Sequence, residues 1–134
     1  MKKIVFVKAI GCVLLAGLSL VGQPVSGADA NSQYRVLTID VVKNCEALNA
    51  AAMRAKTQDD WGALYGFSLY TMGYLTGINR LAYDTHDIAG KKNVKTLMVW
   101  LERYCREHPK KSFDYALHQL VAVLYPVRVT SAPQ

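Results

Sequence analysis

Apolar residues recur at the spacing of an α-helix in four stretches of the chain. This periodicity predicts helices over residues 38–55, 60–83, 94–107 and 113–125. The sequence contains no credible run of strand-forming residues and no internal repeat. The predicted fold is therefore all-α, a small single-domain bundle of about four helices.

Capping residues and a proline mark the limits of these stretches. Asn93 and Ser112 directly precede the third and fourth predicted helices, and their side chains can cap a first turn. Either Asp59 or Asp60 can do the same for the second helix. Pro109 follows the third helix, where a proline prevents the helix from continuing.

The second predicted helix is apolar nearly all round and contains several glycines. Gly66, Gly73 and Gly77 fall along one stripe, and each glycine inside a helix costs about 0.5–1 kcal/mol relative to alanine. We expect this stripe to let another helix or a bulky ring pack unusually close. The Gly-xxx-Gly spacing also fits a membrane dimerisation face, but Trp61 and Arg80 favour the central helix of a bundle.

The first thirty residues have the pattern of a secretory signal peptide. A basic start, Met1-Lys2-Lys3, precedes an apolar run over residues 9–21 and then a series of small residues. We expect residues 1–28 to be removed, with the cut somewhere in 27–30, and we expect the protein to be exported. Two alternatives stay open, an uncleaved N-terminal anchor and lipid attachment at Cys12.

The mature chain, residues 29–134, is expected to form one helical domain with flexible ends and a core over about 38–126. The whole sequence has 16 basic and 10 acidic residues, a formal net charge of +6. Removal of the signal peptide takes away three lysines and no acid, which leaves 13 basic residues and a net charge of +3. This mild excess, without a basic helix face, argues against nucleic acid as a partner.

Two cysteines remain after processing, Cys45 and Cys105. In an exported chain, two cysteines far apart in sequence indicate one disulfide. Closing a loop of this length stabilises the fold by about 4 kcal/mol in the chain-entropy model. Two unpaired thiols are the alternative.

The sequence contains few of the residue groups that catalysis needs. Its three histidines form no motif with a serine or cysteine nucleophile, and it has no phosphate-binding loop and no paired-cysteine metal motif. Asp84, His86 and Asp87 lie close together after the second predicted helix, but one imidazole makes an incomplete ligand set. A solvated turn is the simpler interpretation, and metal binding there stays open. We predict a protein that is not an enzyme and has no cofactor.

The third and fourth predicted helices resemble those of a known family. From Trp100 the sequence reads WLERYCREHPKKSFDYALHQLVAVL, and upstream lie Asn44-Cys45-Glu46 and the motif GYLTGIN. These residues resemble the HdeA/HdeB family of small periplasmic acid-stress chaperones over about residues 40–125. The resemblance implies a helical fold, a periplasmic location and a family disulfide between Cys45 and Cys105. The glycine-rich second helix and the long connection from Tyr83 to Asn93 depart from that family.

A looser resemblance is to periplasmic immunity proteins of the Tai type, which neutralise secreted cell-wall amidases. Those proteins have a Gly-Tyr-x-x-Gly helix, here Gly73-Tyr74-Leu75-Thr76-Gly77, and a late helix that ends near a Tyr-Pro pair, here Tyr125-Pro126. A further cysteine pair that is common among them is missing from this sequence. The resemblance implies an alternative function, binding and inhibition of one secreted effector enzyme.

The chaperone resemblance implies a switch driven by proton uptake. Below about pH 3 the carboxylates are neutral while Lys and Arg stay charged. The net charge of the mature chain then rises from +3 to about +16, because the histidines are protonated as well. Such repulsion would loosen the bundle, weaken a possible homodimer and open apolar faces to unfolding client proteins.

The immunity alternative requires a partner surface that exists at neutral pH. The candidates are the exposed parts of Tyr65, Tyr70 and Tyr74, since aromatic side chains dominate interface energetics. The other interpretation of each ring is a place in the core. Under either function, we expect the partners to be other proteins.

Overall fold

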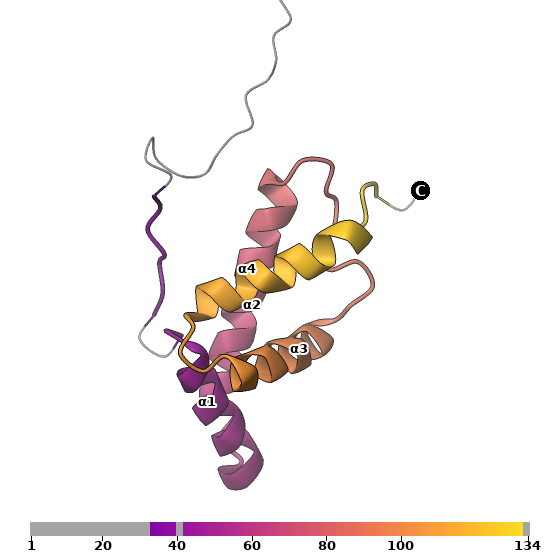
Figure 1. Cartoon of the computed structure of the whole chain (residues 1–134). Coiled ribbons are helices and arrows are strands. Elements are labelled where there is room, and N and C mark those ends of the chain that lie inside the picture. Colours follow the sequence, from indigo (N-terminus) through magenta and orange to yellow (C-terminus); the bar gives the residue numbers. More distant parts are fainter. Residues whose placement is uncertain (1–32, 40–41, 133–134) are drawn as a thin grey trace, which may run out of the picture. The chain divides into compact units, whose positions relative to one another are not determined.

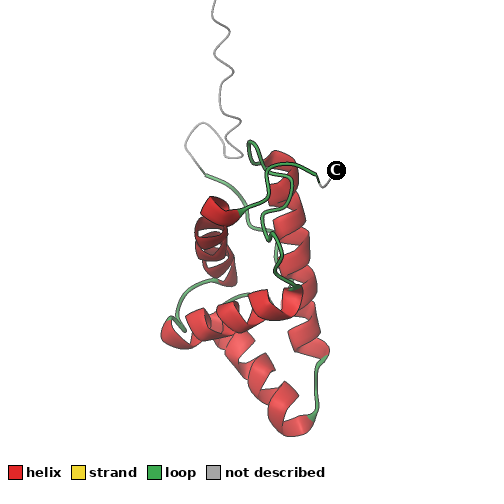
Figure 2. Ribbon diagram, turned by 90° about the vertical axis from the view of Figure 1, so that its right-hand side faces the viewer, coloured by secondary structure: helices red, strands yellow, loops and turns green. Residues whose placement is uncertain are grey.

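The computed structural model describes residues 33–39 and 42–132, and in them the chain folds into four α-helices. These are α1 (Cys45–Gln58), α2 (Gly62–Leu81), α3 (Val94–Glu107) and α4 (Phe113–Leu124), and a 3₁₀ turn, η1 (Tyr125–Val127), follows (Figure 1). The described residues form helices and loops and no β-strand (Figure 2). The prediction of a small, single-domain, all-α fold with four helices is confirmed.

The predicted signal peptide, residues 1–28, and Cys12 lie outside the described residues. Within the described part of the chain, no helix combines the length and the apolarity that crossing a bilayer requires. Even α2, which has 20 residues, does not meet this requirement.

An apolar core holds the four helices together. Both α3 and α4 cross over α2, and α1 packs against α2 and α3 (Figure 1). The rings of Phe67 from α2 and Phe113 from α4 meet edge to face, with 4.8 Å between their centroids. Both rings are completely buried, and full burial of a side chain of this kind stabilises a fold by about 1.5–3 kcal/mol. This contact fixes α4 against α2.

The first helix begins at Cys45, later than the predicted start at residue 38. Asn44 occupies the N-cap position, and its side-chain oxygen accepts a hydrogen bond of 2.9 Å from the amide of Ala47. Asn44 also forms an isolated antiparallel bridge with Ser112, the N-cap of α4. This pairing holds Asn44 in an extended conformation. The helix prediction is therefore wrong for the described residues before Cys45.

The turn between α1 and α2 contains two aspartates with different roles. Asp59 adopts a left-handed conformation, with a φ of 53°, and closes α1. The carboxylate of Asp60 accepts a hydrogen bond of 3.2 Å from the amide of Gly62, which stabilises the first turn of α2. Asp60 therefore takes the predicted capping role, although Trp61 occupies the N-cap position itself.

The limits of α3 and the start of α4 agree with the prediction. Asn93 accepts a hydrogen bond of 2.9 Å from the amide of Thr96, and Ser112 accepts one of 3.2 Å from the amide of Tyr115. Each bond satisfies an N–H group that the first turn of a helix leaves unpaired. Both helices therefore begin where their capping side chains predict.

The chain beyond α4 is hydrogen-bonded to the connection between α2 and α3. The carbonyl of Val129 accepts hydrogen bonds from the amides of His86 and Asp87, and its own amide donates to the carbonyl of Asp87 at 2.9 Å. The side chain of Arg128 donates to the carbonyl of Asp84 at 3.0 Å. The C-terminal segment is therefore paired with this connection as far as Val129.

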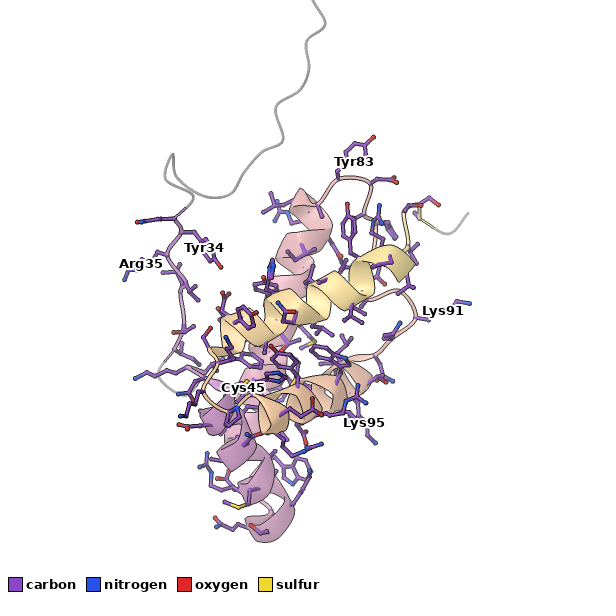
Figure 3. The ribbon with its side chains drawn as sticks, in the orientation of Figure 1. Tyr34, Arg35, Cys45, Tyr83, Lys91 and Lys95 are labelled. Carbon is purple, nitrogen blue, oxygen red and sulfur yellow. A yellow bond between two sulfur atoms is a disulfide. The ribbon has the colours of Figure 1, made fainter. Side chains whose placement is uncertain are left out.

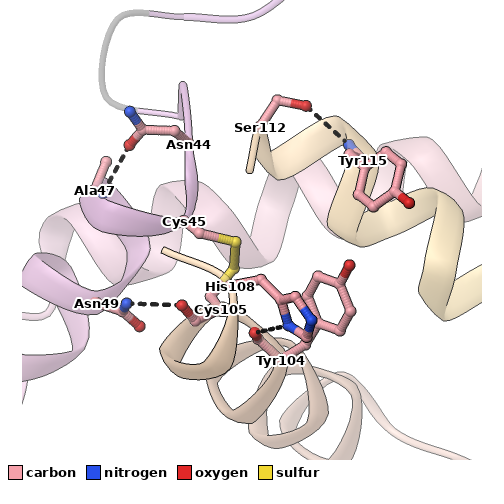
Figure 4. Close-up of a disulfide and its surroundings, with 9 residues drawn as sticks. All are labelled: Asn44, Cys45, Ala47, Asn49, Tyr104, Cys105, His108, Ser112 and Tyr115. Carbon is pink, nitrogen blue, oxygen red and sulfur yellow. Dashed lines mark hydrogen bonds between the residues drawn. A yellow bond between two sulfur atoms is a disulfide. The ribbon is translucent and has the colours of Figure 1, made fainter. Parts of the chain in front are cut away.

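Cys45 and Cys105 form a disulfide, as predicted, with their Cα atoms 4.7 Å apart (Figure 4). Both cysteines are completely buried. The bond joins the first residue of α1 to the last turn of α3. Next to it, the side-chain amide of Asn49 donates a hydrogen bond of 3.0 Å to the carbonyl of Cys105. The two helices are thus held at two neighbouring points.

Replacement of both Cys45 and Cys105 by alanine should lower the free energy of unfolding by about 2–4 kcal/mol, because the crosslink restricts the unfolded chain. Guanidinium unfolding followed by circular dichroism measures the change. The wild-type protein in reductant is the reference that leaves the sequence intact. Equal unfolding midpoints for the double variant and the oxidised wild type would contradict a stabilising role for this bond.

Candidate functional site

An open groove with a volume of about 530 Å³ runs between α2 and α3. Its walls come from the first half of α2 and from one side of α3. The residues that line it are Trp61, Leu64, Tyr65 and Ser68 from the first wall and Val94, Lys95, Met98, Val99 and Glu102 from the second. We refer to this surface as the α2–α3 groove.

The spacing of residues along each helix places the lining side chains on one face. Trp61 and Tyr65 are four residues apart at the start of α2, and Val94 and Met98 are four apart at the start of α3. Met98 is buried, and the hydroxyl of Thr71 lies 3.7 Å from its sulfur. The groove is therefore built directly on side chains that belong to the core.

Three large apolar side chains of the groove are exposed to solvent. Trp61 is 55% exposed, Tyr65 is 63% exposed and Val99 is 60% exposed. The indole Nε1 of Trp61 donates a hydrogen bond of 2.7 Å to the carboxylate of Asp59, which restrains the ring. Exposed apolar side chains gathered around one hollow are typical of a surface that binds another molecule.

The polar side chains Glu102 and Ser68 of the groove are already engaged. The Glu102 side chain is only 14% exposed, and its carboxylate lies 3.2 Å from Lys56 Nζ and 4.0 Å from the guanidinium of Arg106. The hydroxyl of Ser68 donates to a backbone carbonyl of its own helix at 3.1 Å. Lys95 projects away from α3 (Figure 3). None of these three groups of the groove forms a pair of nucleophile and base with another.

The three predicted partner-surface tyrosines do not lie together. Tyr65 lines the groove, whereas Tyr70 and Tyr74 are half-buried and pack against the core. The Tyr70 ring lies 6.2 Å from the ring of Phe113. Burial and, to a smaller extent, the carboxylate of Asp114 raise the pKa of the Tyr70 phenol. Only Tyr65 therefore belongs to the candidate site, and core packing is the outcome for the other two rings.

The predicted close packing over the glycine stripe is wrong at Gly73 and Gly77. A Cβ atom added at either position would meet no heavy atom within 4 Å, apart from the backbone of the helix itself. The buried side of α2 is formed by Phe67, Thr71 and Leu75 instead. Gly66, the third residue of the stripe, is partly buried. Gly73 and Gly77 face away from the core because the larger apolar residues of α2 occupy the buried side.

The acidic residues next to His86 form an ion pair and a hydrogen bond with nearby segments of the chain. The carboxylate of Asp84 lies 3.8 Å from the guanidinium of Arg128, and that of Asp87 accepts a hydrogen bond of 3.0 Å from the amide of Ala89. Among the described residues, no three histidine, cysteine, aspartate or glutamate side chains lie close enough to hold a metal ion. Here the cluster positions the C-terminal segment.

A second group of aromatic side chains lies on α3. The rings of Trp100 and Tyr104 stack with 5.3 Å between centroids, and the ring of His108 stacks on Tyr104 at 4.3 Å. His108 Nδ1 also lies 3.0 Å from the carbonyl of Tyr104 (Figure 4). Burial, followed by the nearby Tyr115, raises the pKa of the Tyr104 phenol. Because these rings cover one another, they offer a partner less free surface than the groove does.

The helical periodicity predicts apolar positions in both helices, but nothing in it assigns Trp61, Met98 or Val99 to a shared surface. The i, i+4 pairs at the starts of both helices are the signal that could have indicated two apolar strips. Which strips face each other depends on the packing of α2 against α3 and is not encoded locally. The groove was therefore missed.

Searches of protein-family models, of curated proteins and of solved structures find no match to this chain. The two family resemblances thus depend on the sequence motifs alone.

Substitution of Gly77 by alanine should raise the free energy of unfolding by about 0.5–1 kcal/mol, because alanine favours the helix and its Cβ meets no neighbour. Thermal unfolding at low protein concentration measures the change. Gly90→Ala is the matched control and should be destabilising, since Gly90 has a φ of +62° that disfavours other residues. A loss of stability in Gly77→Ala would mean that the chain packs against this glycine after all.

Proposed function

We propose that this chain is an exported, non-enzymatic protein that binds one partner protein at neutral pH through the α2–α3 groove. The observation that carries the proposal is the exposure of Trp61, Tyr65 and Val99 around a groove that exists in the folded chain. Aromatic residues at such positions supply most of the binding energy in many interfaces. An apolar segment of the partner, such as one face of a helix, would fill the groove.

The groove is organised before any partner arrives. The hydrogen bond from Trp61 to Asp59 restrains the indole, and the ion pairs of Glu102 with Lys56 and Arg106 compensate its charge. Binding would therefore order few side chains and leave no carboxylate of the groove without a cation. Both effects reduce the costs that offset the energy of an interface.

The position of the ion pairs favours this function over an acid-driven chaperone. The carboxylates of Asp60 and Asp84 lie at exposed ion pairs with Arg54 and Arg128. Exposed pairs contribute about 0–1 kcal/mol each, whereas an apolar core and a disulfide hold the helices. Protonation of these two carboxylates would remove little of what stabilises the fold, and among the described ion pairs only those of Glu102 involve a largely buried carboxylate. The resemblance to Tai-type immunity proteins therefore fits better. By that resemblance, the partner is a secreted effector enzyme and the compartment is the periplasm.

Capture of a partner at neutral pH tests the proposed function. The purified protein should retain one stoichiometric partner from an extract of its own compartment, and Val99→Glu should remove that partner because it places a charge in the groove. Val123→Glu is the control, since Val123 is exposed on α4 outside the groove. Equal retention by the two variants would contradict a role for the groove, provided that circular dichroism shows both to be folded.

An acid titration separates the two candidate functions. We expect the helical signal in circular dichroism to persist from pH 7 to about pH 2, below the ordinary range of carboxylate pKa values, because the ion pairs of Asp60 and Asp84 are exposed and the apolar core and the disulfide hold the helices. We also expect no suppression of aggregation when a client protein is unfolded by acid and followed by light scattering. Loss of structure together with strong suppression would favour the chaperone function instead.

A further inference from the structure

The α3 wall of the α2–α3 groove differs in charge between its two ends. At one end, the carboxylate of Glu102 lies near two cations, Lys56 and Arg106. At the other end, Lys95 is exposed and forms no ion pair with any described residue. About 10 Å of helix separates these two positions. Within the described part of the chain, the charges of the groove are therefore paired at one end only.

The surroundings of Lys95 add to its positive charge. Lys91 and Lys92 are exposed in the turn just before α3, and Lys91 and Lys95 both extend into solvent (Figure 3). Asp87, the nearest acid that precedes α3 in the sequence, does not line the groove, and its carboxylate accepts a hydrogen bond of 3.0 Å from the amide of Ala89. This end of the groove therefore attracts an anionic group.

The position of Lys95 does not favour the stability of its own helix. Lys95 lies in the first turn of α3, which contains no acidic residue. A cation at the start of a helix opposes the helix dipole, whereas an acid there stabilises the helix. The ammonium group also has no hydrogen bond or ion pair with the described residues. At the edge of an apolar groove, such a cation is available to a ligand of the groove.

We propose that the groove binds an amphipathic helix of the partner protein, with apolar residues against its walls and an acidic residue paired with Lys95. This inference rests on the proposed function and narrows it to one class of partner segment. The lining residues run from Trp61 to Ser68 on α2 and from Val94 to Glu102 on α3, which is about two helical turns on each wall. Two turns is the length of the i to i+7 row of anchors by which an amphipathic helix docks in a groove. The acidic residue gives specificity and speeds association.

Two helical peptides with the same apolar face test this inference. The polar positions are glutamate in one peptide and lysine in the other. Fluorescence anisotropy of the labelled peptides measures both dissociation constants for protein purified after expression of the full chain. At low salt the acidic peptide should bind at least about tenfold more tightly than the basic one. The ratio should fall as NaCl is added, because salt screens exposed charges.

Lys95→Glu should abolish the preference for the acidic peptide and keep the fold, since an acid stabilises the start of a helix. Lys110→Glu is the matched control, because it makes the same change in net charge at an exposed lysine outside the groove, and it should retain most of the preference. Val99→Glu should weaken the binding of both peptides, because it places a charge in the apolar part of the groove. Circular dichroism establishes that each variant is folded.

Equal loss of the preference in Lys95→Glu and Lys110→Glu would overturn the inference, since the preference would then come from net charge alone. Equal binding of both peptides that Val99→Glu removes would also overturn it, but would leave the proposed function of the groove intact. A groove that binds a fluorescent long-chain fatty acid and neither peptide would belong to a lipid and overturn it as well. Binding of none of these probes would do the same, and partner capture would then decide the proposed function by itself.

Discussion

The disulfide between Cys45 and Cys105 constrains the arrangement of the helices more than any other contact, because it joins the start of α1 covalently to the end of α3. Beside it, the backbone bridge between Asn44 and Ser112 brings the start of α4 to the same place (Figure 4). The ends of three helices therefore meet at one point. Apolar packing, such as that of Phe67 on the fourth helix, holds α2 against this frame. The wall of the groove that α3 forms thus belongs to the part of the fold that the disulfide fixes.

Local chemistry decided which parts of the fold could be predicted from the sequence. The starts of α3 and α4 were predictable because Asn93 and Ser112 cap helices through bonds to residues three positions away. The start of α1 was not, since the bridge to Ser112 keeps Asn44 extended and comes from a distant segment. The pairing of Val129 with Asp87 was missed for the same reason. A periodic pattern shows that a helix exists, but it does not show which backbone groups other segments occupy.

The candidate site was less predictable than the fold because it depends on how helix faces are oriented. Tyr65 and Tyr70 lie on the same helix, yet a difference of five positions turns one ring into the groove and the other toward Phe113. The sequence shows that both are aromatic and gives no direction to either. Val99 looks like an ordinary surface residue until α2 is packed beside it. Orientation is a tertiary property, and it appears only once the core is assembled.

The helix α2 is apolar on three sides, of which only one is buried in the core. One side is buried in the core through Phe67 and Leu75. A second side, with Tyr65, forms a wall of the groove, and a third side, with Leu69, is uncharged and exposed to solvent. A helix that is apolar all round is normally surrounded by its own chain or by lipid, but this one is packed by its own chain on one side only. If a partner covers the groove, two of the three sides are buried, and the side with Leu69 and Gly73 stays in solvent.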